Sequence, residues 1–129
     1  MERLDLGIFV AASPDEVYLA WVDGDRHAAM SGGGASSDPR VGGRFTAWDG
    51  YIQGEHVALE PGRRVVQRWR TAEFPPDAPD SLLELTLEAV PGGTRVTLVH
   101  TEIPDGQAAR YDEGWVKFYF EPMRAFFGG

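Results

Sequence analysis

The side chains best suited to proton transfer or metal binding are three histidines, His27, His56 and His100. They fall in different predicted elements, and no pair has the i,i+4 spacing that would place two imidazoles on one helix face. We expect His27 and His56 to be surface or hydrogen-bonded residues. His100 alternates with Val96 and Leu98 on the predicted inner face of a strand, where a buried imidazole needs a polar partner. That partner is either a group of the protein or the polar head of a ligand.

No other side chains form a recognisable catalytic set. The chain has no cysteine, so thiolate metal sites and cysteine nucleophiles are excluded. The glycine clusters Gly32–Gly34 and Gly42–Gly43 are not followed by the residues of a phosphate-binding loop. Carboxylate pairs such as Asp112 and Glu113 fall on segments predicted to be exposed, whereas an acid–base pair needs one member removed from water. The sequence therefore nominates no catalytic residue, no metal site and no cofactor.

The overall charge limits the partners that the chain can bind. Twelve lysines and arginines against twenty aspartates and glutamates give a formal net charge of −8, which repels nucleic acid and anionic membranes. No apolar run approaches the roughly 20 residues of a membrane-spanning helix. The lack of cysteine suits a reducing compartment, so we predict a cytoplasmic location. We expect neither a nucleic-acid partner nor a membrane protein, and both a monomer and a homodimer remain open.

The length of 129 residues predicts a single domain over residues 1–129. The first ten residues alternate in the manner of a strand. Ser13 followed by Pro14 and Glu16 then has the residue types of a capped helix start. A second short helix is predicted over Asp25–Met30. The chain therefore begins with a strand and two short helices.

The middle of the sequence predicts consecutive strands joined by tight turns. Asp49-Gly50 and Pro61-Gly62 are strong turn signals, and three prolines make Phe74–Asp80 a loop. Apolar and polar residues alternate between the turns, as in a sheet with one wet face. Strands are expected at Phe45–Trp48, Tyr51–Leu59, Arg64–Thr71, Ser81–Val90 and Thr94–Thr101.

The end of the sequence predicts a long helix with an aromatic face. Apolar residues recur there at spacings of three and four, at Tyr111, Trp115, Phe118, Tyr119, Met123 and Phe126. Pro122 lies inside this pattern and should kink or break the helix near Phe118–Pro122. Because only this helix is large enough to cover the apolar face of the sheet, we predict an α+β fold. A curved antiparallel sheet of about six or seven strands would wrap around the long C-terminal helix.

A series of short motifs covers most of the chain in a fixed order. It comprises Gly42–Phe45, Asp49-Gly50 with Gln53–Glu55, Leu59–Pro61, Val65–Arg70, Thr94–Leu98, Ile103-Pro104, Gly114-Trp115 with Tyr119–Glu121, and Phe126–Gly128. The series resembles the C-terminal domain of activators of the 90-kDa heat-shock-protein ATPase. The resemblance implies a helix-grip (START-like, Bet v-like) fold of the SRPBCC superfamily. Eukaryotic activators carry a further N-terminal domain, for which this chain has no room, so the fold transfers more readily than the activity.

Related START-like proteins hold hydrophobic small molecules or lipids between the sheet and the helix. Inward alternation and the aromatic stripe place candidate cavity residues on both sides of this space. They are Phe45, Gln67, Trp69, Leu83, Leu85, Val96, Leu98, His100, Trp115, Tyr119 and Met123. The leading hypothesis is therefore a non-enzymatic domain that binds a hydrophobic small molecule or lipid.

Two other functions remain open at the level of sequence. The resemblance implies a co-chaperone-like module that binds and stimulates a heat-shock protein 90 chaperone. Its candidate contact surface is the arginine face of one strand, formed by Arg64, Arg68 and Arg70, which otherwise serves as a solvated outer surface. A third hypothesis is a START-like cyclase or hydrolase that uses His100 as general acid or base, although no second catalytic group can be named beside it.

Overall fold

Seven strands form one antiparallel sheet in the computed structural model, which describes residues 1–128. The order across the sheet is β1-β7-β6-β5-β4-β3-β2, so consecutive strands are neighbours and β1 closes against β7. The strands are β1 (Glu2–Val10), β2 (Ser36–Ser37), β3 (Arg44–Ala47), β4 (Ile52–Glu60), β5 (Arg64–Thr71), β6 (Ser81–Val90) and β7 (Gly93–Ile103). The predicted α+β sheet is confirmed.

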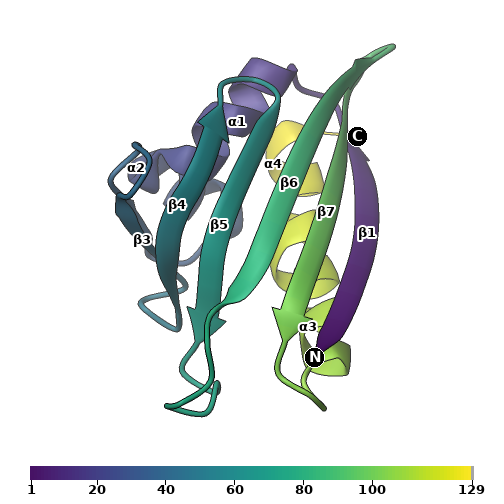
Figure 1. Ribbon diagram of the computed structural model, residues 1–129. Helices are drawn as coiled ribbons and strands as arrows, with labels where there is room; N and C mark the ends of the chain where they lie inside the picture. Colours follow the sequence, from purple (N-terminus) through teal and green to yellow (C-terminus); the bar gives the residue numbers. More distant parts are fainter. Residues whose placement is uncertain (129) are drawn as a thin grey trace.

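All helices lie on one face of this sheet (Figure 1). They are α1 (Pro14–Val22), α2 (Gly24–Ser31), α3 (Ala108–Trp115), the π-helical segment η1 (Val116–Phe120) and α4 (Glu121–Phe127). The start of α1 follows the sequence signal, because the Ser13 hydroxyl accepts a hydrogen bond from the Glu16 amide at 3.2 Å and Pro14 occupies the first turn. The sheet thus curves around the C-terminal helix, as in the predicted helix-grip fold.

Pro122 changes the C-terminal helix without ending it. The predicted kink is a π-helical turn, in which the Glu121 amide donates to the Val116 carbonyl five residues earlier. Proline has no amide hydrogen, so the regular ladder cannot continue through position 122. The turn inserts one extra residue, which changes the faces of α3 and α4 that meet the sheet.

The inner face of β6 and β7 holds the centre of the core. Leu83, Leu85, Val96 and Leu98 are at most 1 % exposed, as their alternation indicates. Helix α1 packs over these strands beside the C-terminal helix. At this level of the sheet the interior is therefore filled by side chains.

Two features of the middle of the chain differ from the sequence prediction. The strand predicted over Phe45–Trp48 ends at Ala47, because Trp48 and Asp49 have left-handed φ values of 51° and 59° and already belong to the turn. The strand β2 has only two residues, Ser36 and Ser37, which are too few and too polar to show a strand pattern.

Candidate functional site

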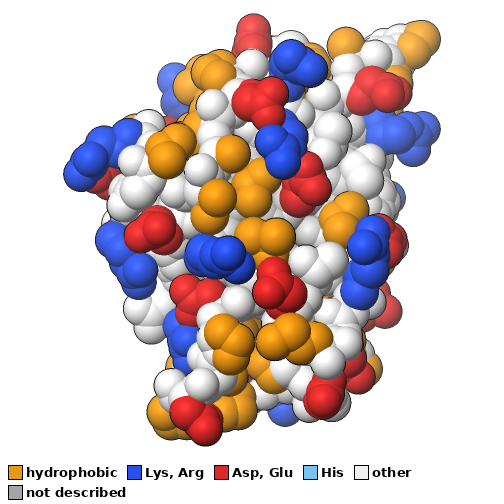
Figure 2. All heavy atoms as spheres, viewed as in Figure 1, with side chains coloured by type: hydrophobic (Ala, Val, Ile, Leu, Met, Phe, Trp, Pro, Cys, Tyr) orange, Lys and Arg blue, Asp and Glu red, His pale blue; other side chains and the backbone are white. Residues whose placement is uncertain are grey.

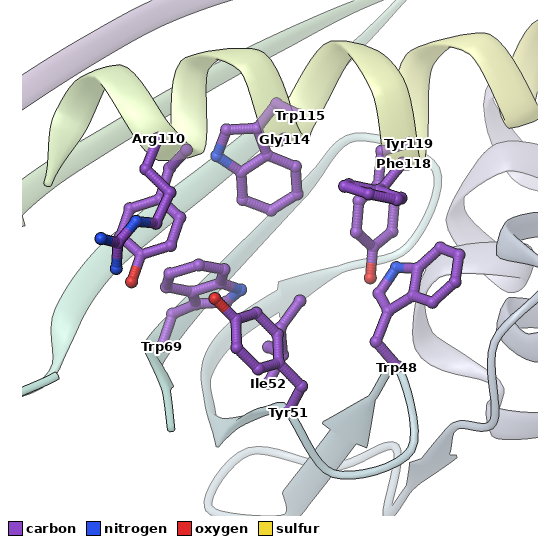
Figure 3. Close-up of a pocket in the computed structure, with 10 residues that line it drawn as sticks. Trp48, Tyr51, Ile52, Trp69, Arg110, Gly114, Trp115, Phe118 and Tyr119 are labelled. Atoms are coloured by element: carbon purple, nitrogen blue, oxygen red, sulfur yellow. The ribbon is translucent and has the colours of Figure 1, made fainter. Parts of the chain in front are cut away.

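A pocket of about 410 Å³ opens between the C-terminal helix and the turn before β4 (Figure 3). The helix forms one wall and the turn with β4 and β5 forms the opposite wall. Most of its lining is aromatic. The lining residues are Trp48, Tyr51, Ile52, Trp69, Arg110, Tyr111, Gly114, Trp115, Phe118 and Tyr119.

The helix wall of the pocket depends on helical spacing and on one glycine. Trp115, Phe118 and Tyr119 project toward the sheet side from the end of α3 and from η1. Gly114 lies beside them, and a Cβ atom placed there would meet no heavy atom within 4 Å. The missing side chain at position 114 is therefore one reason why this space is open.

The opposite wall depends on an unusual turn. Trp48, Asp49 and Gly50 all have left-handed φ values, which turns the Trp48 ring toward Phe118, with ring centroids 5.4 Å apart. The six-membered part of the indole packs on Gly33, where an added Cβ would lie 2.5 Å from the ring. The Trp48 Nε1 atom is buried and has no hydrogen-bond partner among residues 1–128. An unpaired buried donor costs free energy, roughly 1–3 kcal/mol.

Two polar side chains at the exposed mouth of the pocket, Arg110 and Tyr51, share one carboxylate partner. Arg110 pairs with Glu73 at 2.9 Å, and the Tyr51 hydroxyl donates a hydrogen bond to the same carboxylate. Burial, together with this bond to Glu73, raises the pKa of Tyr51 to about 12. Tyr51 therefore stays protonated near neutral pH and donates to Glu73.

The structure divides the residues that the sequence nominated for a cavity. Trp69, Trp115 and Tyr119 line the pocket. Phe45 and Gln67 border a separate void of about 10 Å³, which is nearly filled by side chains. The remaining nominated residues are buried in the core and do not line the pocket, namely Leu83, Leu85, Val96, Leu98, His100 and Met123.

Gln67 belongs to a buried hydrogen-bond network. Its carbonyl oxygen accepts from the Trp21 indole at 3.3 Å, and its amide lies 3.3 Å from His56 Nδ1. His56 Nε2 in turn lies 2.9 Å from the Ser37 hydroxyl. Because the Gln67 amide can only donate, His56 carries its proton on Nε2. The inward amide is thus used by the protein.

His100 is also bonded through both ring nitrogens. The Trp115 indole donates to Nδ1 at 3.1 Å, so Nε2 carries the proton and donates to the Ser81 hydroxyl at 2.8 Å. That hydroxyl donates to the Trp69 carbonyl. Burial lowers the pKa of His100 to about 3. Neither nitrogen is free for a reacting group, which argues against the acid–base role considered from the sequence.

The third histidine anchors a wall of the pocket. His27 Nδ1 donates to the Trp21 carbonyl at 3.0 Å, and Nε2 accepts from the Tyr119 hydroxyl at 2.7 Å. Burial lowers the pKa of His27 to about 4 and raises that of Tyr119. The Tyr119 ring therefore faces the pocket with its hydroxyl already bonded.

The three arginines nominated for a partner surface differ in their surroundings. Arg64 pairs with Glu60 and Glu84. Arg70 pairs with Asp80 and also donates to two carbonyl groups of the β5–β6 loop. Arg68 is 46 % exposed, and its contact with Glu102 is a loose 3.6 Å. Figure 2 shows basic and acidic side chains interspersed over this face of the sheet.

Several pocket residues escaped the sequence prediction. Trp48 and Tyr51 belong to a turn, where no alternation indicates the direction of a side chain. Tyr111, Gly114 and Phe118 share a helix face with Trp115, so their spacing could have nominated them. Arg110 carried no signal, because its position depends on the ion pair with Glu73.

Among residues 1–128 there is no group of three or more histidine, aspartate or glutamate side chains that could hold a metal ion. Over the same residues, no helix has the length and apolar character needed to cross a membrane.

A curved antiparallel sheet that holds a C-terminal helix, with an apolar pocket between them, defines a helix-grip protein. Within this class, the model of the family described as "Activator of Hsp90 ATPase homolog 1-like protein" matches residues 11–128. The chain belongs to this family.

Individual relatives agree with this assignment. The chain is 28% identical over 116 residues to the human "Activator of 90 kDa heat shock protein ATPase homolog 1", covering 90% of this chain and 34% of that protein. The chain therefore spans about a third of the length of this curated relative. Its fold also matches two solved structures in which nearly the whole of both chains is aligned.

The first of these structures is an HSP90 activator from Plasmodium falciparum, with a TM-score of 0.89 and 21% identity, covering 99% of this chain and 97% of the other. The second is the Aha1 dimer from Colwellia psychrerythraea, with a TM-score of 0.81 and 22% identity, covering 99% and 98%. At these identities the two structures show a common fold.

Proposed function

We propose that the chain is a co-chaperone module that binds a chaperone of the 90-kDa heat-shock class and raises its ATPase rate. The observation that carries the proposal is the match of the family model to residues 11–128. The Plasmodium falciparum protein, described as an HSP90 activator, supports it because this fold makes up 97% of that chain. Such a contact requires both proteins in one compartment, in accord with the predicted cytoplasmic location.

The arginine face of β5 is the proposed contact surface. Arg68 is its most available member, because Arg64 is held by two carboxylates and Arg70 holds a loop. An acidic partner surface that displaced Glu102 would lose little, since an exposed pair at 3.6 Å contributes roughly 0–1 kcal/mol. We therefore place Arg68 at the centre of the contact.

The steady-state ATPase rate of the host's own 90-kDa heat-shock chaperone tests this function. The rate should rise and saturate as the chain is added, and Arg68→Glu should raise the concentration needed for half of the effect. Arg95→Glu is a matched control. Arg95 lies on the same outer face in β7, and its replacement by glutamate causes the same change in charge. An unchanged rate at saturating chain would overturn the proposal.

A second function, the binding of a hydrophobic small molecule, is favoured by a different observation. The pocket of about 410 Å³ falls within the roughly 300–1,000 Å³ of small-molecule sites and is largely aromatic. Arg110 and the hydroxyls of Tyr51 and Tyr119 are bonded to protein partners, whereas the Trp48 indole nitrogen is not. Both ring nitrogens of His27 and of His100 are bonded within the protein, so these surroundings favour the binding of a molecule over catalysis.

A variant that fills the pocket provides the test of this second function. Gly114→Leu places a side chain in open space on the pocket wall, so it should remove binding without disturbing the fold. Native mass spectrometry and solvent extraction of the wild-type protein should recover a bound hydrophobic molecule that the variant lacks. Wild-type protein that is empty and takes up no neutral aromatic probe at tens of micromolar would contradict this function.

A further inference from the structure

We infer that the pocket selects uncharged aromatic molecules over anionic amphiphiles such as fatty acids, and that Glu73 determines this choice. The inference rests on the second function proposed above, because it assumes that the pocket binds a small molecule. It specifies the class of molecule that the pocket binds and the residue that distinguishes uncharged from anionic molecules.

The walls favour an aromatic occupant. The Trp69 ring lies 5.5 Å from the Trp115 ring and 5.1 Å from the Tyr111 ring, measured between centroids. Trp48 and Phe118 face each other at the other end of the pocket (Figure 3). Aromatic rings attract one another in tilted and edge-to-face arrangements. A rigid ring also loses less conformational freedom on binding than a long acyl chain.

The mouth offers no unpaired positive charge to an anionic head group. Arg110 alone is charged among the described residues that line the pocket, and it pairs with Glu73 at 2.9 Å. The Tyr51 hydroxyl donates to the same carboxylate, and the Tyr111 hydroxyl donates to Gln107. A carboxylate or sulfonate that approached Arg110 would therefore meet the negative charge of Glu73 at close range. The net charge of −8 adds long-range repulsion.

An uncharged molecule meets none of these costs. It can leave the Arg110–Glu73–Tyr51 cluster intact and bury its apolar surface against the rings. Glu73 thus acts without touching the occupant: it neutralises the one cation of the lining and engages the hydroxyl beside it. Glu73 is a specificity-determining residue of the mouth.

Two fluorescent probes of the same skeleton separate charge from shape. N-phenyl-1-naphthylamine is neutral, and 8-anilinonaphthalene-1-sulfonate carries one sulfonate on the same ring system. Wild-type protein should bind the neutral probe more tightly, and equimolar oleate should not displace it. Glu73→Gln keeps the shape of the side chain but leaves Arg110 without its carboxylate. It should strengthen binding of the sulfonate by roughly five-fold, the upper limit for an exposed pair, with little effect on the neutral probe.

Two control variants make the result specific. Glu113→Gln causes the same change in net charge on the outer surface of α3, so it should leave the ratio of the two affinities unchanged. Gly114→Leu should abolish binding of the neutral probe, which shows that the signal comes from the pocket.

The outcomes distinguish this inference from the function on which it rests. Equal affinity for the two probes, displacement by oleate, or an unchanged ratio in Glu73→Gln would overturn the role of Glu73. If Gly114→Leu still blocked the neutral probe, the pocket would remain a binding site. Failure of the wild-type protein to bind the neutral probe would overturn both.

Discussion

At the scale of single residues, the buried histidines are structural groups held neutral by their surroundings. His27 and His100 each use one ring nitrogen as donor and the other as acceptor, and burial lowers the pKa of both. Protonation would convert the accepting nitrogen into a donor that faces another donor. The free energy of unfolding therefore depends on pH through these two histidines.

Stability should fall as the pH is lowered below about 6.5, the ordinary pKa of histidine. The folded pKa values, about 4 for His27 and about 3 for His100, lie below that of the unfolded chain, so the unfolded state binds more protons in this range. The free energy of unfolding should then drop with decreasing pH by at most about 1.4 kcal/mol per unit for each histidine.

Urea titrations at pH 7, 6 and 5 measure this slope, and NMR of the imidazole Cε1 protons supplies the control. The signals of both residues should not titrate between pH 8 and 5. A midpoint near 6.5 for either signal would contradict the assignment of neutral, buried rings.

Two glycines should respond in opposite ways to the same substitution. Gly114→Ala should stabilise the protein by about 1 kcal/mol, because alanine is the better helix residue and the new methyl group meets open space. Gly33→Ala should destabilise it by roughly 1–3 kcal/mol, because its Cβ would lie 2.5 Å from the Trp48 ring. Urea denaturation checks both, and equal effects of the two variants would refute the described packing around the pocket.

At the scale of elements, the bounds of strands were predicted most accurately where apolar and polar residues alternate most regularly. The alternation in Ser81–Val90 and in Arg64–Thr71 predicted the bounds of β6 and β5 correctly. The turn at Asp49-Gly50 was predicted, but not that it already includes Trp48, because a left-handed φ value at a non-glycine residue does not change the alternation of residue types. Pro122 indicated where the last helix is irregular but not that a π-helical turn would keep it continuous.

The β5–β6 loop should depend on Arg70. This side chain donates to the carbonyls of Pro75 and Ala78 and pairs with Asp80, so it closes the loop back onto the sheet. Arg70→Ala should speed amide hydrogen exchange and proteolytic cleavage within residues 74–80, while the sheet stays protected. Arg64→Ala, on the same strand, serves as the control. Unchanged exchange in the loop would show that the three bonds do not hold it.

At the scale of the whole molecule, the sheet separates two proposed sites. The arginine face of β5 is on the outer surface, where Arg68 is 46 % exposed, and the aromatic pocket lies on the inner side beneath the C-terminal helix (Figure 3). The sequence could predict which residues turn inward, yet not where the interior stays open. A void is the difference between the space enclosed by the elements and the volume of their side chains. Here the void depends on the missing side chain at Gly114, on the turn at Trp48 and on the π-helical turn in the C-terminal helix.

NMR of the labelled chain during addition of the unlabelled chaperone tests this arrangement most directly. We expect amide signals around Arg68 on the outer face of β5 to shift or broaden, while those of Trp115 and Tyr119 keep their positions until the neutral aromatic probe is added. Perturbations that gathered at the pocket on addition of the chaperone, or no perturbation by a saturating amount, would contradict it.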